Sequence, residues 1–253
     1  MVASDVQNRS SVVTSVSASW KVPAIKASEN NTFSGVWVGI GGYGDETLIQ
    51  IGTEQEYYVG GGFNYYTWYE LLPDYLVPIS NIYVRPGDNI TASITLVNDN
   101  ASAWLIEISD ITQNQHFRRA VFYNSSRLSA EWILERPQVN NASSTLADFE
   151  NLTFTECKAT IEGVTKTIGN SSYNQLVMAD NQDNPLVSVS PLNGDGSSFN
   201  VTYLGTANAT APTTNLHFNK FTELSPACFI STVFLENSIL MFEVKVFRKK
   251  RYL

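Results

Sequence analysis

The run Val36-Trp37-Val38-Gly39-Ile40-Gly41-Gly42 is followed closely by a second run, Thr47-Leu48-Ile49-Gln50-Ile51. With Tyr43-Gly44, the glycines of the first run match the pattern G-x-G-x-x-G after an apolar strand, as in dinucleotide-binding proteins. That motif requires a helix directly after the glycines. Here the alternation of a strand resumes instead, so the glycine cluster is predicted to be a turn between two strands. This context excludes a nucleotide-binding motif.

The same kind of pattern recurs along most of the chain. Short runs of β-branched and aromatic residues alternate with polar ones and are bounded by turn-forming residues, which is typical of strands. The predicted strands are Ser11–Trp20, Ser34–Gly39, Thr47–Gly52, Tyr65–Leu71, Asn89–Leu96, Ala103–Ile108, His116–Tyr123, Ala130–Glu135, Leu152–Thr155 and Phe199–Tyr203. Many strands without helical crossovers predict an all-β fold, an antiparallel β-sandwich of two large sheets.

Composition narrows the class of protein. The net charge is −8, and only 16% of the residues are charged, which argues against nucleic-acid binding because phosphates require clustered Lys and Arg. An acidic chain with few charges suits work in acid, where few ion pairs are lost by protonation. Cys157 and Cys228 allow at most one disulfide, and His116 and His217 are too scattered for a zinc site. No cofactor or metal is expected.

Sequons indicate the compartment. Asn-x-Ser/Thr occurs at ten positions, Asn8, Asn30, Asn89, Asn100, Asn124, Asn141, Asn151, Asn170, Asn200 and Asn208, whereas chance predicts about four. An Asn-, Ser- and Thr-rich surface could produce sequons by itself, but the excess favours a secreted glycoprotein. No signal peptide is visible at the start of this chain.

Three regions are expected. Residues 1–11 form an N-terminal segment, 12–204 the β-sandwich domain, and 205–253 a linker followed by an apolar tail. Phe229–Phe247 is strongly apolar and precedes the basic run Arg248–Arg251, a combination seen at membrane anchors. Charges at Glu236, Glu243 and Lys245 are costly within a bilayer, so extra strands or a non-native tail are favoured over membrane association.

The strand Ala130–Glu135 carries two acids on one face. Glu131, Ile133 and Glu135 share that face, which suggests a glycosidase. The Cα atoms of the two acids would lie roughly 13 Å apart, whereas retaining glycosidases need carboxyl groups about 5 Å apart. The middle position of the β-glucanase signature is an acid, and here it is Ile133. Glu131 is therefore interpreted as a hydrogen-bonding acid that supports the strand.

Four runs in order resemble the glutamic peptidases, also called eqolisins, on a concanavalin A-like lectin/glucanase-type sandwich. They are V-W-V-G-I-G-G (36–42), L-I-Q-I-G (48–52), W-Y-E-L-L-P (68–73) and A-E-W-I-L-E (130–135). S-W-K-V-P (19–23) precedes them and L-A-D-F (146–149) follows. The resemblance covers about residues 12 to 203, and the W-V-G-I-G-G and W-Y-E-L-L-P versions look like a prokaryotic branch of the family.

The resemblance implies the site residues. Gln50 and Glu135 match the catalytic pair, while Trp37, Trp68 and Glu70 match residues that line the substrate cleft. Two positions depart from the fungal members, which carry Asp at the position of Gly41 and Tyr at the position of Leu72. Pockets inferred from those members therefore do not carry over directly.

A chemical role follows for each member of the pair. Glu135 would act as general base on a water and return the proton to the departing amine. The Gln50 amide always carries N–H groups and would stabilise the oxyanion. The expected function is a secreted, monomeric acid endopeptidase acting on polypeptides. The alternative is a non-catalytic carbohydrate- or protein-binding module on the same lectin-like sandwich.

Overall fold

The structure, a computed structural model, describes residues 12–139 and 142–205, and the backbone of 231–235. Within these ranges the only helical element is one short 3-10 turn, Ile168–Asn170. The strands are β1 (Val13–Lys21), β2 (Thr32–Gly41), β3 (Leu48–Tyr58), β4 (Gly62–Leu71), β5 (Val77–Ile79), β6 (Asn89–Asn98), β7 (Ala103–Asp110), β8 (Gln115–Phe122), β9 (Ala130–Glu135), β10 (Gln138–Val139), β11 (Ala142–Ser143), β12 (Thr145–Leu146), β13 (Asn151–Ile161), β14 (Val164–Thr167), β15 (Tyr173–Leu176), β16 (Val187–Val189), β17 (Phe199–Tyr203) and β18 (Ser231–Leu235).

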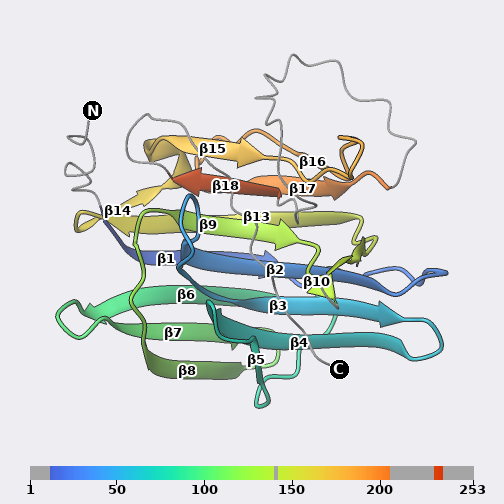
Figure 1. Cartoon of the computed structure of the whole chain (residues 1–253), viewed down its shortest axis with the longest axis horizontal. Helices are drawn as coiled ribbons and strands as arrows, with labels where there is room; N and C mark the ends of the chain where they lie inside the picture. Colours follow the sequence, from blue (N-terminus) through green and yellow to red (C-terminus); the bar gives the residue numbers. More distant parts are fainter. Residues whose placement is uncertain (1–11, 140–141, 206–230, 236–253) are drawn as a thin grey trace.

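Two large sheets form a sandwich, as predicted. The first sheet has the order β16-β17-β13-β1-β6-β7-β8, with β14 paired to β13. The second has the order β15-β18-β9-β2-β3-β4-β5, and β12 joins β2 in the one parallel pairing among the described strands. The long strands of both sheets run along the long axis of the molecule (Figure 1). The all-β antiparallel sandwich is confirmed.

Every predicted strand is present, and several are longer than predicted. The strand predicted at Thr47–Gly52 runs from Leu48 to Tyr58, because apolar alternation stops at Gly52 and polar side chains occupy both faces beyond it. The glycine cluster begins inside β2, which ends at Gly41, and the turn follows. Gly41 has a φ of +82°, a conformation that glycine adopts without steric cost.

The main core lies between the two sheets. Along β1, alternation buries Val16, Ala18 and Trp20 while the intervening serines remain half-exposed. The indole Nε1 of Trp20 donates to Thr53 Oγ1 of β3 at 3.1 Å, which satisfies both buried polar groups across the core. Because each strand has a period of two, one face of every long strand contributes to this core and the other face is left for the surface or the site.

Part of the C-terminal region adds a strand to the second sheet. β18 falls in the apolar run and pairs antiparallel with β9, with Phe234 opposite Glu131. Among the described residues, no helix is long and apolar enough to cross a membrane. Cys157 is buried on β13, whereas Cys228 and most of the predicted linker and tail lie outside the described residues.

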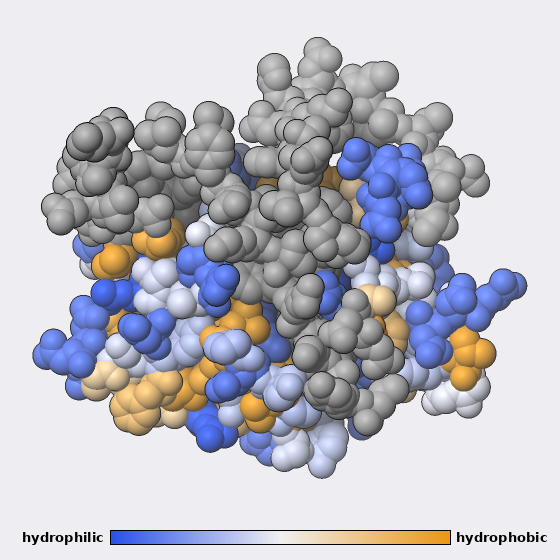
Figure 2. Space-filling model, in the orientation of Figure 1, coloured by the Kyte–Doolittle hydropathy of each residue, from blue (hydrophilic) through white to orange (hydrophobic). Residues whose placement is uncertain are grey.

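The described surface is mixed in character. In Figure 2, hydrophobic and hydrophilic residues are interspersed over the lower part of the visible face. Large exposed apolar side chains such as Val59, Ile111 and Phe122 lie at separate places in the chain. Single exposed hydrophobic residues are ordinary on folded proteins.

Candidate active site

The candidate residues lie on the outer face of the second sheet, which is the face turned away from the first sheet. In β3, Ile51 belongs to the main core, so Gln50 points outwards. In β9, Leu134 belongs to the core, so Glu135 points outwards. Strict alternation therefore places both predicted catalytic residues on one face.

The strand register arranges this face in rows that cross β9, β2, β3 and β4. The Gln50 row consists of Glu131, Gly39, Gln50 and Glu70; the next row consists of Ile133, Trp37, Gly52 and Trp68; the Glu135 row consists of Glu135, Gly35, Glu54 and Tyr66. Gln50 and Glu135 are two rows apart and have β2 between them. The Trp37 row lies between their two rows.

The Gln50 amide is oriented by a neighbouring acid. Its Nε2 donates to Glu70 Oε2 at 2.5 Å, and Gln50 is only 3% exposed. Its Oε1 is buried and has no hydrogen-bond partner among the described residues. An amide carries two N–H donors and one carbonyl acceptor, so this arrangement leaves one N–H and the carbonyl available to a water or a substrate.

Glu135 lies next to a second acid that the sequence analysis did not single out. A Cβ on Gly35 would stand 3.2 Å from Glu54 Oε2, 3.4 Å from Glu135 Cγ and 3.6 Å from Glu135 Oε1. Both carboxyl groups therefore lie within contact distance of the same point above Gly35, which has no side chain to separate them. The available signal was the spacing, since Glu54 follows Gln50 by four residues on the same strand and shares its face.

The second acid of β9, Glu131, is in a different environment. It is 3% exposed, and Ser129 Oγ donates to its Oε1 at 3.0 Å. Burial raises the pKa of the Glu131 carboxyl well above its usual value of 4.5, and the nearby charges of Asp45 and Glu135 add to the increase, although the Ser129 hydrogen bond opposes it. The raised pKa favours the neutral form of Glu131, which fits the interpretation that it supports the strand.

The raised pKa of Glu131 predicts a pH dependence of stability. A carboxyl whose pKa is higher in the folded state binds its proton more tightly there, so its contribution is present in acid and is lost as the pH rises above about 4.5. We expect Glu131→Gln, which keeps the shape without the charge, to have a higher melting temperature than the wild type at pH 7 and a similar one at pH 3. Calorimetry at both pH values measures this, and an equal shift at both would contradict it.

Trp37 and Trp68 belong to a small cluster separate from the main core. They pack with Leu48, Leu72 and Ile133 on the outer face, and both indoles are almost fully buried. The Nε1 of Trp37 has no hydrogen-bond partner among the described residues. Since buried indole N–H groups usually find a partner, this donor is available to a group that binds on this face.

Two glycines make room for Trp37. A Cβ on Gly52 would stand 2.2 Å from the carbonyl oxygen of Val36 and 2.5 Å from Trp37 Cβ. A Cβ on Gly39 would stand 2.8 Å from the Trp37 ring. These contacts are closer than packed atoms allow, so the glycines of the W-V-G and Q-I-G runs are required by the position of the indole.

Glu56 extends the acidic face by one more row. Tyr66 Oη donates to it at 3.0 Å, Asn64 Nδ2 at 2.8 Å and Tyr58 Oη at 3.2 Å. Three donors satisfy this carboxylate within the protein. Glu56 therefore differs from Glu54 and Glu135, whose side chains both border the space above Gly35.

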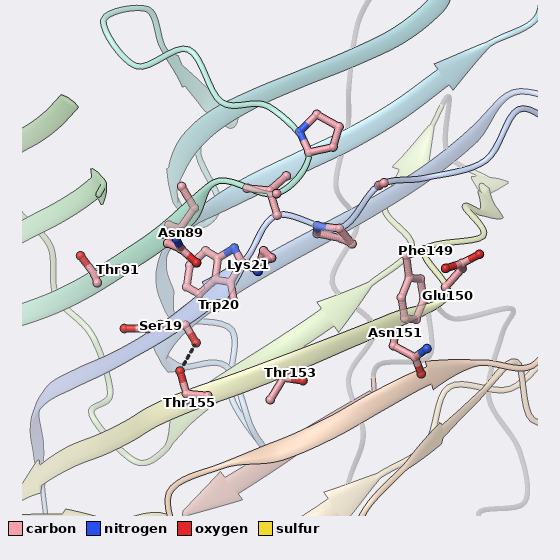
Figure 3. A pocket seen from close by; sticks show the side chains of 16 residues that line it. Ser19, Trp20, Lys21, Asn89, Thr91, Phe149, Glu150, Asn151, Thr153 and Thr155 are labelled. Atoms are coloured by element: carbon pink, nitrogen blue, oxygen red, sulfur yellow. Dashed lines mark hydrogen bonds between the residues drawn. The ribbon is translucent and has the colours of Figure 1, made fainter. Parts of the chain in front are cut away.

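A groove elsewhere contains none of the candidate residues. It lies along β1, β6 and β13 and is lined by small polar side chains such as Ser19, Thr91 and Thr155, with Thr155 Oγ1 donating to the Ser19 carbonyl at 3.3 Å (Figure 3). No group of three or more metal-ligating side chains was found in the described part of the chain.

Comparison with known proteins defines the class. Residues 3–203 match the model of the peptidase A4 family. Aspergillopepsin-2 of Aspergillus niger is 32% identical over 173 residues, which cover 66% of this chain and 58% of that protein. This chain thus belongs to the peptidase A4 family, the family of the glutamic peptidases, and the recognition from the sequence motifs is confirmed.

Solved structures show the same fold. The scytalido-glutamic peptidase bound to a transition-state analogue inhibitor superposes with a TM-score of 0.63 at 23% identity, covering 76% of this chain and 93% of that one. The aspergilloglutamic peptidase from Aspergillus niger superposes with a TM-score of 0.59 at 26% identity, covering 68% of this chain and 99% of that one.

The structure explains one departure from the fungal pattern. A Cβ on Gly41 would stand 2.4 Å from the carbonyl oxygen of Thr47, and the φ of Gly41 is positive. Any side chain at this position would collide with that carbonyl oxygen, so the backbone at the end of β2 requires glycine here. Leu72, at the other departure, joins the Trp37–Trp68 cluster through its side chain.

Proposed function

We propose that this chain is an acid endopeptidase that hydrolyses polypeptides with Glu135 as general base and Gln50 as oxyanion donor. The observation that carries the proposal is the Gln50 amide. It is buried on the same face as Glu135, Glu70 accepts a hydrogen bond from it, and its carbonyl has no hydrogen-bond partner within the described ranges. A buried amide group without a partner is costly in a purely structural role. Membership of the peptidase A4 family supports the same reaction.

The reaction follows from these groups. Glu135 removes a proton from a water, and the resulting hydroxide attacks the peptide carbonyl carbon. The remaining N–H of Gln50 donates to the oxyanion as it forms, and the Gln50 carbonyl orients the water. Glu135 then gives its proton to the departing amine as the C–N bond breaks. Trp37 and Trp68 are proposed to contact the substrate. Glu70 is proposed to position the Gln50 amide and also to border the substrate.

An assay of the wild type tests the proposal. Purified protein is incubated with a denatured protein substrate at pH 3 and pH 7, with and without an inhibitor of aspartic peptidases. We expect cleavage at pH 3 that the inhibitor does not affect, because the mechanism uses one carboxylate and an amide. Absence of cleavage across the acid range, from a folded sample, would reject the peptidase and favour the binding module.

We further propose that the protein is secreted and glycosylated, and two sequons on the outer face of the first sheet support this. Asn151 of β13 and Asn200 of β17 each accept a hydrogen bond from the threonine of the other sequon, Thr202 Oγ1 at 2.8 Å and Thr153 Oγ1 at 2.7 Å. Each bond uses the amide oxygen and leaves the nitrogen, the atom that a glycan would modify. Peptide mass spectrometry of protein from its native host should find glycan at these two asparagines, and unmodified peptides at both would reject the proposal.

A further inference from the structure

The acid at Glu54 has no role in the reaction described so far. It is fully buried on the outer face of β3, in the same row as Glu135, with Gly35 between the two strands that carry them. Neighbouring strands lie about 4.8 Å apart, so two glutamates on either side of a glycine can bring their carboxyl groups together above it. A Cβ on Gly35 would touch both side chains, at 3.2 Å from Glu54 Oε2 and 3.6 Å from Glu135 Oε1, so both carboxyl groups border the same space above this glycine.

Two carboxyl groups that converge away from water do not both carry a negative charge. Like charges at short distance repel, and burial removes the solvent that would screen them. In general, the repulsion is relieved when one member of such a pair keeps its proton. The other carboxyl groups on this face belong to Glu131 on β9, Glu56 on β3 and Glu70 on β4. None of them brings a positive charge that would favour a second ionisation of the Glu54–Glu135 pair.

We propose that Glu54 is a positioning residue for Glu135: the two carboxyl groups share one proton above Gly35, and the O–H of Glu54 holds one oxygen of Glu135 while the other oxygen binds the water. The inference rests on the proposed function of Glu135. The shared proton stays on the pair during the reaction, and the proton that moves to the amine comes from the attacking water through Glu135.

The consequence is a pH profile with two limits. In strong acid the pair gains a second proton and Glu135 loses its basicity. At higher pH the shared proton leaves, Glu54 becomes a second negative charge, and it repels Glu135 instead of holding it. Activity therefore requires the singly protonated pair.

The variant Glu54→Gln tests whether Glu54 sets the alkaline limit of the pH profile. Its side-chain NH2 still donates to Glu135 but cannot lose a proton, so we expect activity in acid within about three-fold of wild type and an alkaline limit that moves up by about one pH unit or more. Glu54→Leu removes the donor, and we expect a lower kcat with little change in KM. Glu56→Gln is the matched control, since it is a buried acid on the same face of the same strand, and we expect it to keep the wild-type limits.

The measurement is the pH dependence of kcat and kcat/KM, with folding checked by circular dichroism. An unshifted alkaline limit in folded Glu54→Gln would overturn the proposal, as would an equal shift in Glu56→Gln. If Glu54→Gln does not fold, carbon-13 NMR of the glutamate carboxyl groups in the wild type decides. Glu54 and Glu135 titrating together in two separated steps would support the shared proton, and two independent single steps would overturn it.

The outcomes distinguish this inference from the proposed function. If Glu135→Gln is inactive and the Glu54→Gln profile is that of the wild type, only the role of Glu54 fails. If Glu135→Gln remains active, the proposed function fails.

Discussion

Glu135→Gln is expected to abolish peptide hydrolysis, lowering kcat by about 10³-fold or more. General acid–base groups contribute about 10²–10⁴-fold each, and Glu135 is proposed to serve both as the base for the water and as the acid for the amine. Glutamine keeps the size and polarity of the side chain but cannot accept the proton. Because the change is nearly isosteric, the fold and substrate binding should be preserved, so the loss should appear in kcat and not in KM.

Glu131→Gln is the matched control for this variant. It makes the same chemical change on the same face of the same strand, four residues away, at a carboxyl whose pKa is already raised by burial. We expect it to retain activity at pH 3. Steady-state kinetics on both purified proteins make the comparison, and an active Glu135→Gln, or an inactive but folded Glu131→Gln, would show that the wrong acid of A-E-W-I-L-E has been assigned.

Gln50→Ala has the second largest expected effect. Removing one oxyanion donor costs about 3–4 kcal/mol of transition-state stabilisation, which corresponds to a loss of about 10²–10³-fold in kcat. The variant also leaves a cavity and removes the amide that donates to Glu70 at 2.5 Å, so its stability should fall as well. The rate must therefore be expressed per folded molecule, with unfolding monitored under the assay conditions.

The variant Gln50→Glu tests the loss of the hydrogen-bond donor without the cavity that Gln50→Ala creates. It fills the same volume, but it offers a donor only while protonated, and it brings a second carboxyl group next to Glu70. We expect residual activity that is confined to lower pH than in the wild type. If Gln50→Glu and Gln50→Ala were both as active as the wild type, Gln50 would have no part in stabilising the oxyanion.

The position of the site on the sheet could be predicted from sequence because strand alternation is a local property. Once Ala130–Glu135 is recognised as a strand with Leu134 facing the core, Glu135 must face outwards, and the same argument holds for Gln50 beside Ile51. The choice between Glu131 and Glu135 could not be made from alternation, since both share one face. It rested on the family motif, and it stays a prediction.

Local sequence also accounts for most strands but not for the short ones. β10, β11 and β12 contain two residues each, too few for any alternation to be recognised. These short strands form because the fold brings their backbone beside another segment that can pair with it, as Thr145 does with Thr32 of β2. Similarly, β18 lies in the apolar run for which extra strands or a non-native tail were favoured, but its place beside β9 depends on a sheet edge that no local pattern describes.

The sequence by itself determined the fold class and the face on which Gln50 and Glu135 lie, because both depend on the period of two within single strands. Tertiary structure alone decided which groups meet across strands: Glu70 at the Gln50 amide, Glu54 beside Glu135 above Gly35, and Gly52 beneath Trp37. Those contacts depend on strand order and register, which are set by the packing of the whole sandwich and place residues far apart in the chain within a few ångströms of one another.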